Sequence, residues 1–304
     1  MNYKVSIVIT AYNVGKYIKE CVQSAIGQTF PCEVIVVADC PTDNTLQELE
    51  QFGKRIRVIP NKINVGAGYS RQIGIAAATG EYVMLLDGDD YIGDIHFVDE
   101  LYKRAQETKA DVVSGGIKIL NEDGTWNATS YGNCTTEGRD KVAKFWGERI
   151  VFMNNKLIRR SLYDKVPYCG RRYIEDTPTI IPILFFANKV VYVDNIGYTY
   201  RMREDSLTHT TNPLKDVIYK GLCWIELVEF FNAVDKGMFD VLNFRGYLGN
   251  IIATLNKMHI TPEAVAPYKA DWDELVMRLW NVMEVTGVNL LDAPKGTKSE
   301  INKE

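Results

Sequence analysis

The chain has 304 residues, and its 46% hydrophobic and 24% charged residues are typical of an ordinary soluble globular protein. A formal net charge of −4 provides no overall attraction to nucleic acid or to an anionic membrane. No stretch approaches the ~20 consecutive apolar residues of a membrane span, and the N-terminal region lacks the apolar core of a secretion signal.

The six cysteines are scattered along the chain and form no Cys-x-x-Cys pair. They are typical of reduced thiols rather than of a disulfide framework, so we expect a cytoplasmic protein, with the inner face of a membrane as the alternative. The histidines His96, His209 and His259 have no zinc-ligand spacing with these cysteines.

The first part of the chain alternates short apolar runs with amphipathic stretches. Asn13, after the first run, is expected to cap the first helix. Strands that alternate with helices through short connections predict a doubly wound, mainly parallel α/β sheet. The predicted strands are 5–9, 33–37, 56–59, 82–86 and 111–115, and the helices between them cover 18–26, 46–49, 68–78 and 95–108.

The middle of the chain is less regular. Residues 121–137 are rich in Gly, Asn, Thr and Ser, which indicates a loop or a hairpin. The stretches 142–150 and 157–163 fit helical or mixed structure. A helix is expected at 179–187, followed by strands at 189–193 and 198–203.

After Pro213 the pattern becomes helical, with amphipathic stretches at 214–234, 238–258 and 262–285. We therefore predict an α/β domain at 1–210, a helical region at 211–292 and a disordered tail at 293–304. The aromatic residues of the helical region are more typical of a core between helices than of an acceptor groove or a dimer interface. They are Trp224, Phe230, Phe231, Trp272 and Trp280.

Three carboxylates, Asp87, Asp89 and Asp90, directly follow the apolar run Tyr82–Leu86. Like charges this close repel, and a divalent cation is the simplest remedy. Carboxylate oxygens suit Mn²⁺ or Mg²⁺, which also bind substrate phosphates. A solvated acidic turn is the alternative interpretation, because Asp and Gly are ordinary turn residues.

Two other polar groups follow predicted parallel strands, and such strand ends converge at one edge of a sheet. Thr10, Ala11 and Tyr12 follow the first strand, and Asp39 follows the second. The Tyr12 ring is suited to packing on a nucleobase, and Asp39 to accepting a base N–H. An aromatic at the edge of the core and an Asx-turn aspartate are the plainer alternatives.

The ordered series of motifs resembles the family-2 glycosyltransferases with the GT-A fold. The resemblance extends from about residue 4 to 209 and does not cover the helical C-terminus. Asp87-Gly88-Asp89 resembles the family's D-x-D metal motif. The other similar segments are 5–13, 33–39, 42–45, 155–160, 175–176 and 198–206.

The resemblance implies a role for each matching residue. Asp39 would contact the nucleobase, Asp87 and Gly88 the ribose or the metal shell, and Asp89 or Asp90 the cation itself. Asp176 would be the general base, with Glu175 beside it. Three further residues would lie near the diphosphate: Arg201, Arg203 and His209, the last also a candidate metal ligand.

Three features leave alternatives open. Ala38-Asp39-Cys40-Pro41 stands where the family has two acidic residues before Gly-Ser, so the base specificity is undetermined. From the residues alone, Glu175 and Asp176 favour a plainer role as acidic residues at a helix start. Arg71 is suited to reaching a phosphate, or to being a solvated helix charge.

We expect a metal-dependent, inverting glycosyltransferase that uses a nucleotide sugar, with UDP as the favoured nucleotide. The expected acceptor is a saccharide or a lipid-linked saccharide. Nucleic acid is least favoured, although Arg159, Arg160, Arg171 and Arg172 keep it open. The alternative is a non-catalytic nucleotide-sugar or glycan-binding module, and the C-terminal helices offer a surface for homo-oligomerisation. A nucleotidyltransferase is disfavoured because no glycine-rich basic loop follows Ile9.

Overall fold

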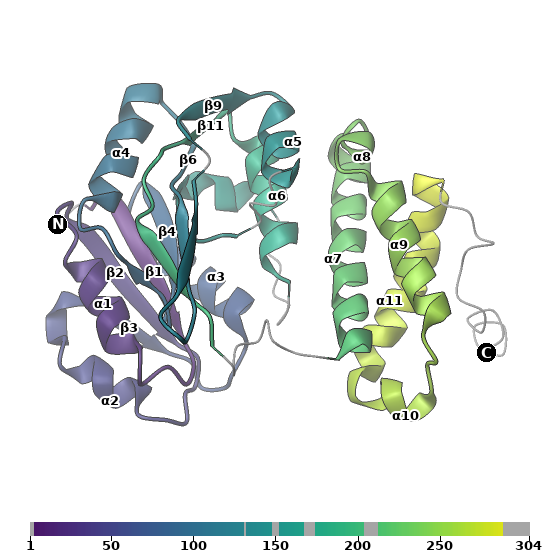
Figure 1. Ribbon diagram of the computed structural model, residues 1–304, viewed down its shortest axis with the longest axis horizontal. Coiled ribbons are helices and arrows are strands. Elements are labelled where there is room, and N and C mark those ends of the chain that lie inside the picture. Colours follow the sequence, from purple (N-terminus) through teal and green to yellow (C-terminus); the bar gives the residue numbers. More distant parts are fainter. Residues whose placement is uncertain (1–2, 131, 148–151, 167–173, 204–211, 288–304) are drawn as a thin grey trace. The chain divides into compact units, whose positions relative to one another are not determined.

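The computed structural model describes residues 3–130, 132–147, 152–166, 174–203 and 212–287. The chain divides into two compact units, residues 1–206 and 207–304. Within the described residues, every strand belongs to the first unit and the second unit is helical (Figure 1).

The first unit is built on an eight-stranded sheet with the order β3-β2-β1-β4-β10-β6-β11-β9. Its first four strands are parallel, which places their carboxyl ends at one edge. Three of the four are buried on both faces, which explains their continuous apolar runs in the sequence, while the edge strand of the four is largely exposed. The four strands are β1 (Val5–Ala11), β2 (Cys32–Ala38), β3 (Arg57–Pro60) and β4 (Tyr82–Asp87).

Helices cover both faces of the parallel strands, so the doubly wound prediction is confirmed (Figure 1). Helix α3 (Ala67–Ala77) packs so tightly that a Cβ at Gly74 would lie 2.2 Å from Val8 Cγ1. The opposite face packs against α1 (Ile18–Ile26) and α4 (Phe97–Thr108). A short helix, α2 (Thr45–Glu50), precedes β3.

The predicted cap at Asn13 is wrong. Helix α1 begins at Ile18, and Tyr17 occupies its N-cap position. Asn13 lies before this helix and has a left-handed backbone with φ 51°. Its side-chain oxygen accepts a hydrogen bond from the Thr42 backbone N–H at 2.8 Å. Asn13 therefore joins the loop after β1 to the loop after β2.

The other half of the large sheet is mixed. It contains β6 (Val112–Ser114), β9 (Cys134–Glu137), β10 (Lys156–Arg159) and β11 (Lys189–Tyr192). Strand β10 runs antiparallel to both β4 and β6. The helical or mixed expectation for 157–163 is therefore corrected to this strand and the 3-10 helix Arg160–Lys165. A short buried apolar run has the same pattern in either structure.

A second, four-stranded sheet has the order β5-β12-β7-β8. Strands β7 (Ile117–Leu120) and β8 (Trp126–Thr129) form the hairpin that the composition of 121–137 indicated. Strand β12 (Tyr198–Arg201) lies between β7 and β5 (Tyr91–Ile92). Two helices complete this unit: α5 (Asp140–Gly147) and α6 (Asp176–Phe186).

The second unit contains the three predicted helical stretches, each with defined caps or breaks. Asn243, with φ 50°, interrupts the stretch 238–258 and caps its longer helix by accepting a hydrogen bond from the Gly246 N–H. Trp224 is buried and stacks on Tyr247 at 4.2 Å, so it belongs to the core. The helices are α7 (Pro213–Val234), α8 (Met238–Val241), α9 (Phe244–Lys257), α10 (Pro262–Val265) and α11 (Lys269–Thr286). None of the helices in the described ranges is long and apolar enough to span a membrane.

Candidate active site

The site begins where β1 and β4 end side by side. The Gly88 backbone N–H donates to the Thr10 carbonyl at 2.9 Å. A Cβ at Gly88 would lie 2.8 Å from that same oxygen, so the close approach of the two chains requires glycine. The buried Cys21 thiol donates to the Asp87 carbonyl from the other side. These contacts fix the backbone from which the three carboxylates project.

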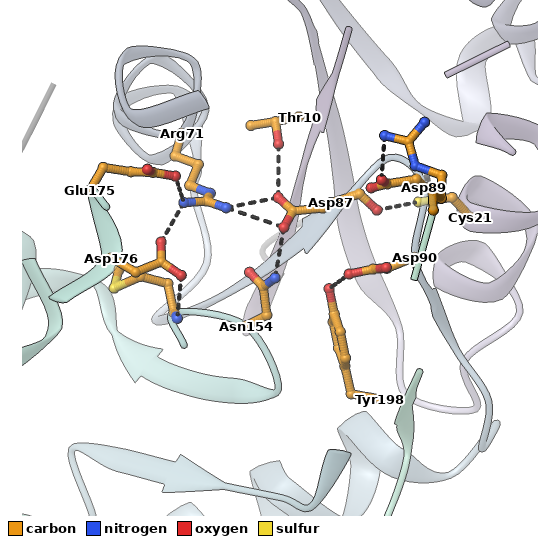
Figure 2. Close-up of polar contacts among 12 residues, drawn as sticks. Thr10, Cys21, Arg71, Asp87, Asp89, Asp90, Asn154, Glu175, Asp176 and Tyr198 are labelled. Atoms are coloured by element: carbon orange, nitrogen blue, oxygen red, sulfur yellow. Dashed lines mark hydrogen bonds and ion pairs between the residues drawn. The ribbon is translucent and has the colours of Figure 1, made fainter. Parts of the chain in front are cut away.

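Asp87 is a meeting point for hydrogen bonds from several elements (Figure 2). Its carboxylate accepts from Thr10 Oγ1 at 3.1 Å, from Arg71 Nη2 at 2.9 Å and from Asn154 Nδ2 at 2.8 Å. Burial opposes ionisation of Asp87, but the Arg71 guanidinium and these hydrogen bonds hold the pKa of Asp87 below its usual value. Asp87 therefore stays ionised.

Arg71 connects Asp87 to the beginning of α6. Its Nη1 donates to Glu175 Oε1 at 2.7 Å and to Asp176 Oδ1 at 2.5 Å, while Nη2 binds Asp87 (Figure 2). Only 4% of Arg71 is exposed. One buried guanidinium thus brings together carboxylates that lie up to 105 positions from it in the sequence.

Glu175 and Asp176 are two carboxyl groups that share this single guanidinium. Burial raises the pKa of Glu175 to about 7; Arg71 opposes the shift and the Asp176 charge adds to it. Burial also raises the pKa of Asp176. The Met153 backbone N–H donates to Asp176 Oδ2 at 3.2 Å, which favours the ionised form of Asp176. The pair is therefore poised to take up a proton near neutral pH.

Asp90 and Asp89 have different surroundings. Asp90 is fully buried and accepts from the Tyr198 hydroxyl at 2.5 Å and from the Arg201 N–H at 2.9 Å. Both Asp90 oxygens are thereby occupied in holding β12 to the end of β4. Asp89 pairs with Arg203 at 2.8 Å, and burial followed by the Asp87 charge raises the pKa of Asp89.

The donor set fits a divalent cation that also has ligands from outside the protein. The side chains of Asp87 and Asp89 are 25% and 19% exposed, so their oxygens are accessible. Across the described ranges, no three His, Cys, Asp or Glu side chains are grouped to hold a metal by themselves. Phosphate oxygens are the natural complement to such an incomplete carboxylate set. His209, the fourth predicted ligand, lies outside the described residues.

The predicted nucleobase edge contains one accessible and one buried side chain. Tyr12 is 48% exposed beyond the end of β1. Asp39 is buried, and its carboxylate accepts from Asn61 Nδ2, the Val65 N–H and the Gly66 N–H at 2.8–2.9 Å. Asp39 thus holds the loop before α3. Ala11 is buried, and its carbonyl accepts from the Asp39 N–H at 2.9 Å.

The predicted phosphate-binding arginines lie at the end of β12. The Arg201 guanidinium packs over the rings of Tyr17 and Tyr91 and pairs with Glu20. Arg203 pairs with Asp89, so this arginine lies at the carboxylate cluster. The basic patch expected for nucleic acid is weakened, because Arg159 pairs with Glu81 and Asp111 inside the fold. Arg171 and Arg172 lie outside the described residues.

Sequence reasoning gave no individual role to three residues of the site, Asn154, Lys156 and Tyr198, although the last two lie in the family-like segments 155–160 and 198–206. Asn154 is buried against Asp87, and Lys156 is buried with its amine donating to Asn155 Oδ1 at 2.6 Å. Burial lowers the pKa of Lys156 to about 7, and the Asp176 charge partly opposes this shift. Three polar residues before an apolar pair, Asn154-Asn155-Lys156-Leu157-Ile158, were the available signal.

The comparisons with known proteins agree with this architecture. The model of the family "Glycosyl transferase family 2" matches residues 6–167. Glycosyltransferase GlyG of Streptococcus pneumoniae is 31% identical over 225 residues, which are 69% of this chain and 74% of GlyG.

Two solved structures share the fold. The S. aureus TarS 1–349 structure in complex with UDP-GlcNAc has a TM-score of 0.66 at 21% identity, covering 91% of this chain and 81% of that one. TarS is a poly(ribitol-phosphate) β-N-acetylglucosaminyltransferase. Mannosyltransferase PcManGT from Pyrobaculum calidifontis, in complex with GDP-Man and Mn²⁺, has a TM-score of 0.54 at 14% identity, covering 94% and 85%. Its match to the family model and to GlyG, together with the GT-A fold of its mixed sheet, shows that this chain belongs to glycosyltransferase family 2 and is a glycosyltransferase.

Proposed function

We propose that this glycosyltransferase moves a sugar from a nucleotide-diphosphate donor to an acceptor hydroxyl with inversion, and that Asp176 is the general base. The observation that carries this proposal is the bridge through Arg71. It links Asp87, at the edge where parallel α/β sheets bind ligands, to the carboxyl pair at the start of α6. The donor-side carboxylate Asp87 and the proposed base Asp176 are thereby bound to the same guanidinium.

On the donor side, Asp87 and Asp89 would hold Mn²⁺ or Mg²⁺. The bound cation would neutralise charge on the leaving diphosphate. Arg203 lies against Asp89 and adds positive charge at the same place. Tyr12 offers an accessible ring for the nucleobase, and UDP is the favoured nucleotide because TarS, with the same fold, was solved with UDP-GlcNAc.

On the acceptor side, inversion requires the hydroxyl to attack opposite the leaving diphosphate. Its proton must then pass to a group on the acceptor face, which a phosphate oxygen cannot provide. Asp176 is held by Arg71 and by the Met153 N–H, so its carboxylate has a fixed orientation. Glu175 shares the same guanidinium, and the Asp176 charge contributes to raising the pKa of Glu175. The acceptor we favour is a saccharide or a polyol chain.

Calorimetry with UDP, in Mn²⁺ or in EDTA, tests the donor and metal assignments. We expect UDP affinity to fall strongly in EDTA and to fall similarly in Asp89→Asn with Mn²⁺ present. Equal affinity with and without metal would reject the cation. Release of UDP from UDP-sugars, with and without an acceptor panel, then separates an enzyme from a binding module. Tight UDP binding with no turnover on any donor would favour the non-catalytic module.

A further inference from the structure

The second sheet of the first unit extends away from the carboxylate edge to an exposed tryptophan. In the strand register, Arg201 of β12 is opposite Leu120 of β7, and Leu120 is opposite Trp126 of β8. Directly opposed residues project from the same face of a sheet. The other face is turned to the core, where Ile117 and Tyr198 are buried. Arg201, Leu120 and Trp126 therefore form one row on the outer face.

One end of this row is part of the candidate active site. The Tyr198 hydroxyl donates to the Asp90 carboxylate (Figure 2). The Arg201 N–H donates to the other oxygen of the same carboxylate. Because neighbouring strands lie about 4.8 Å apart, Trp126 stands about 10 Å from Arg201 along the row. A single monosaccharide at the reaction centre would not reach Trp126, but a chain acceptor would.

Trp126 is the one large apolar side chain of its strand. Strand β8 (Trp126–Thr129) is an edge strand with every residue exposed, and the residues after Trp126 are Asn127, Ala128 and Thr129. Fully 58% of Trp126 is exposed. The Lys118 amine lies over its ring at 4.7 Å from the ring centre. This contact fixes the indole plane.

The hairpin turn holds Trp126 in place. The Asn121 N–H donates to the Thr125 carbonyl at 2.8 Å, and the Thr125 N–H and hydroxyl both donate to Asp123 Oδ1. Gly124 adopts the left-handed backbone, with φ 83°, that this turn needs. Trp126 immediately follows this bonded turn, so the turn fixes the position of its backbone.

We propose that Trp126 is an acceptor subsite that stacks on a pyranose ring of a glycan chain whose reacting end lies at the carboxylate edge. An indole presents a flat apolar face, which suits the C–H face of a sugar ring. The Lys118 amine supplies a hydrogen-bonding group beside it, as the hydroxyls of a sugar require. This inference rests on the proposed transfer to a saccharide acceptor and adds the site that selects a chain over a monosaccharide.

The test uses the full chain with its five tryptophans labelled with ¹⁵N, so that each indole N–H gives one NMR signal. Trp126→Phe assigns the Trp126 signal. The probes are chitotetraose, cellotetraose and maltotetraose, each compared with its monosaccharide. We expect at least one tetrasaccharide to shift the Trp126 signal, and its monosaccharide to leave it unchanged. The dissociation constant should rise about tenfold in Trp126→Ala and less in Trp126→Phe, which keeps a flat ring.

Ile95→Ala is the matched control, because Ile95 is similarly exposed and lies outside the row. It should bind the tetrasaccharide as the unchanged protein does. Wild-type affinity in Trp126→Ala, or no Trp126 shift with any of the three tetrasaccharides, would overturn the proposal. UDP calorimetry in Mn²⁺ on the same samples keeps the two proposals separate. Donor binding with no saccharide binding rejects the subsite alone, whereas saccharide binding without donor turnover rejects the proposed transfer.

Discussion

Arg71 is buried among carboxylates, whereas the sequence suggested a phosphate contact or a solvated helix charge. A phosphate contact was expected, yet its guanidinium binds Asp87, Glu175 and Asp176 in a buried site. Three carboxylates cannot be buried together unless cations or protons balance them. Arg71 supplies positive charge, and the raised pKa of Glu175 indicates where a proton remains. Burial lowers the pKa of the nearby Lys156 to about 7, so its amine is only partly charged at neutral pH. The proposed base Asp176 and the donor-side carboxylate Asp87 thus share one buried cation, Arg71.

Replacing Arg71 with Ala should therefore destabilise the protein by about 3 kcal/mol, because it leaves buried carboxylates without their partner. Urea unfolding followed by circular dichroism measures the change. Arg57→Ala is the matched control, since Arg57 is an exposed arginine, and it should change the free energy of unfolding by less than about 0.5 kcal/mol. Equal effects in the two variants would show that the Arg71 ion pairs contribute no net stability.

Asp176→Asn should keep UDP affinity near that of the unchanged protein and lose most transfer, because the amide has no basic oxygen. Loss of a general base typically lowers the rate by ~10²–10⁴-fold. Single-turnover transfer and UDP calorimetry provide the two readouts. Glu175→Gln should be the milder change. Near-normal turnover in Asp176→Asn would move the role of base to another residue, with Glu175 the next to test.

The rate of transfer should fall as the pH drops through the raised pKa of Asp176, because a protonated carboxyl cannot accept the acceptor's proton. In Glu175→Gln the neighbouring negative charge is absent, so the pKa of Asp176 falls and the acid limb should move to lower pH. A pH profile of kcat/KM for both proteins measures the shift. The stability effect has a related sign: burial favours the protonated carboxyls, so this site contributes less to stability as pH rises through about 7. An unchanged acid limb in Glu175→Gln would exclude the coupling.

At the scale of elements, the carboxylates after β4 divide into two tasks. Asp87 and Asp89 keep accessible oxygens, while Asp90 joins the loop after β4 to β12 through Tyr198 and the Arg201 N–H. Sequence reasoning treated Asp89 and Asp90 as interchangeable metal ligands. Burial of Asp90, with a hydrogen bond to each of its oxygens, makes its role structural in this arrangement.

Tyr198→Phe should destabilise the protein by about 1–3 kcal/mol, since it leaves Asp90 buried with one hydrogen bond fewer. Tyr69→Phe, at an exposed tyrosine, is the control and should be close to neutral. Thermal unfolding of both variants is the measurement. If the two variants unfold alike, the Tyr198–Asp90 hydrogen bond contributes no net stability.

At the scale of the whole molecule, the described donor-side residues Tyr12, Asp87, Asp89 and Arg203 belong to the unit of residues 1–206. The helical unit has its own core, built around buried residues such as Trp224, Phe231 and Phe244. We propose that this unit serves the acceptor or the assembly of subunits, and not the nucleotide.

Substituting partly exposed side chains of the helical unit should then alter acceptor transfer or oligomeric state and leave UDP affinity unchanged. Met277→Ser is the clearest variant, because Met277 is an exposed apolar residue in α11. Light scattering gives the oligomeric state, and calorimetry gives the UDP affinity. A weakened UDP affinity in Met277→Ser would contradict this division of roles.

The parallel half of the large sheet could be predicted from the sequence, because β1, β2 and β4 are buried on both faces and give continuous apolar runs. The sequence also identified the carboxylates after β4, since three acidic residues after an apolar strand need compensation. The capped starts of the C-terminal helices, such as Asn212-Pro213 and Thr261-Pro262, were equally local signals.

Only the tertiary structure decided which partners those residues have. Strand β10 could not be distinguished from a helix, because its apolar run is short and fits either structure. Its pairing with β4 and β6 makes it a strand. The contact of Arg71 with Asp176, across 105 positions, and of Asp90 with Tyr198, across 108, have no local signature. These side chains pair because the sheet brings their loops together. Their spacing in the sequence does not predict which loops meet.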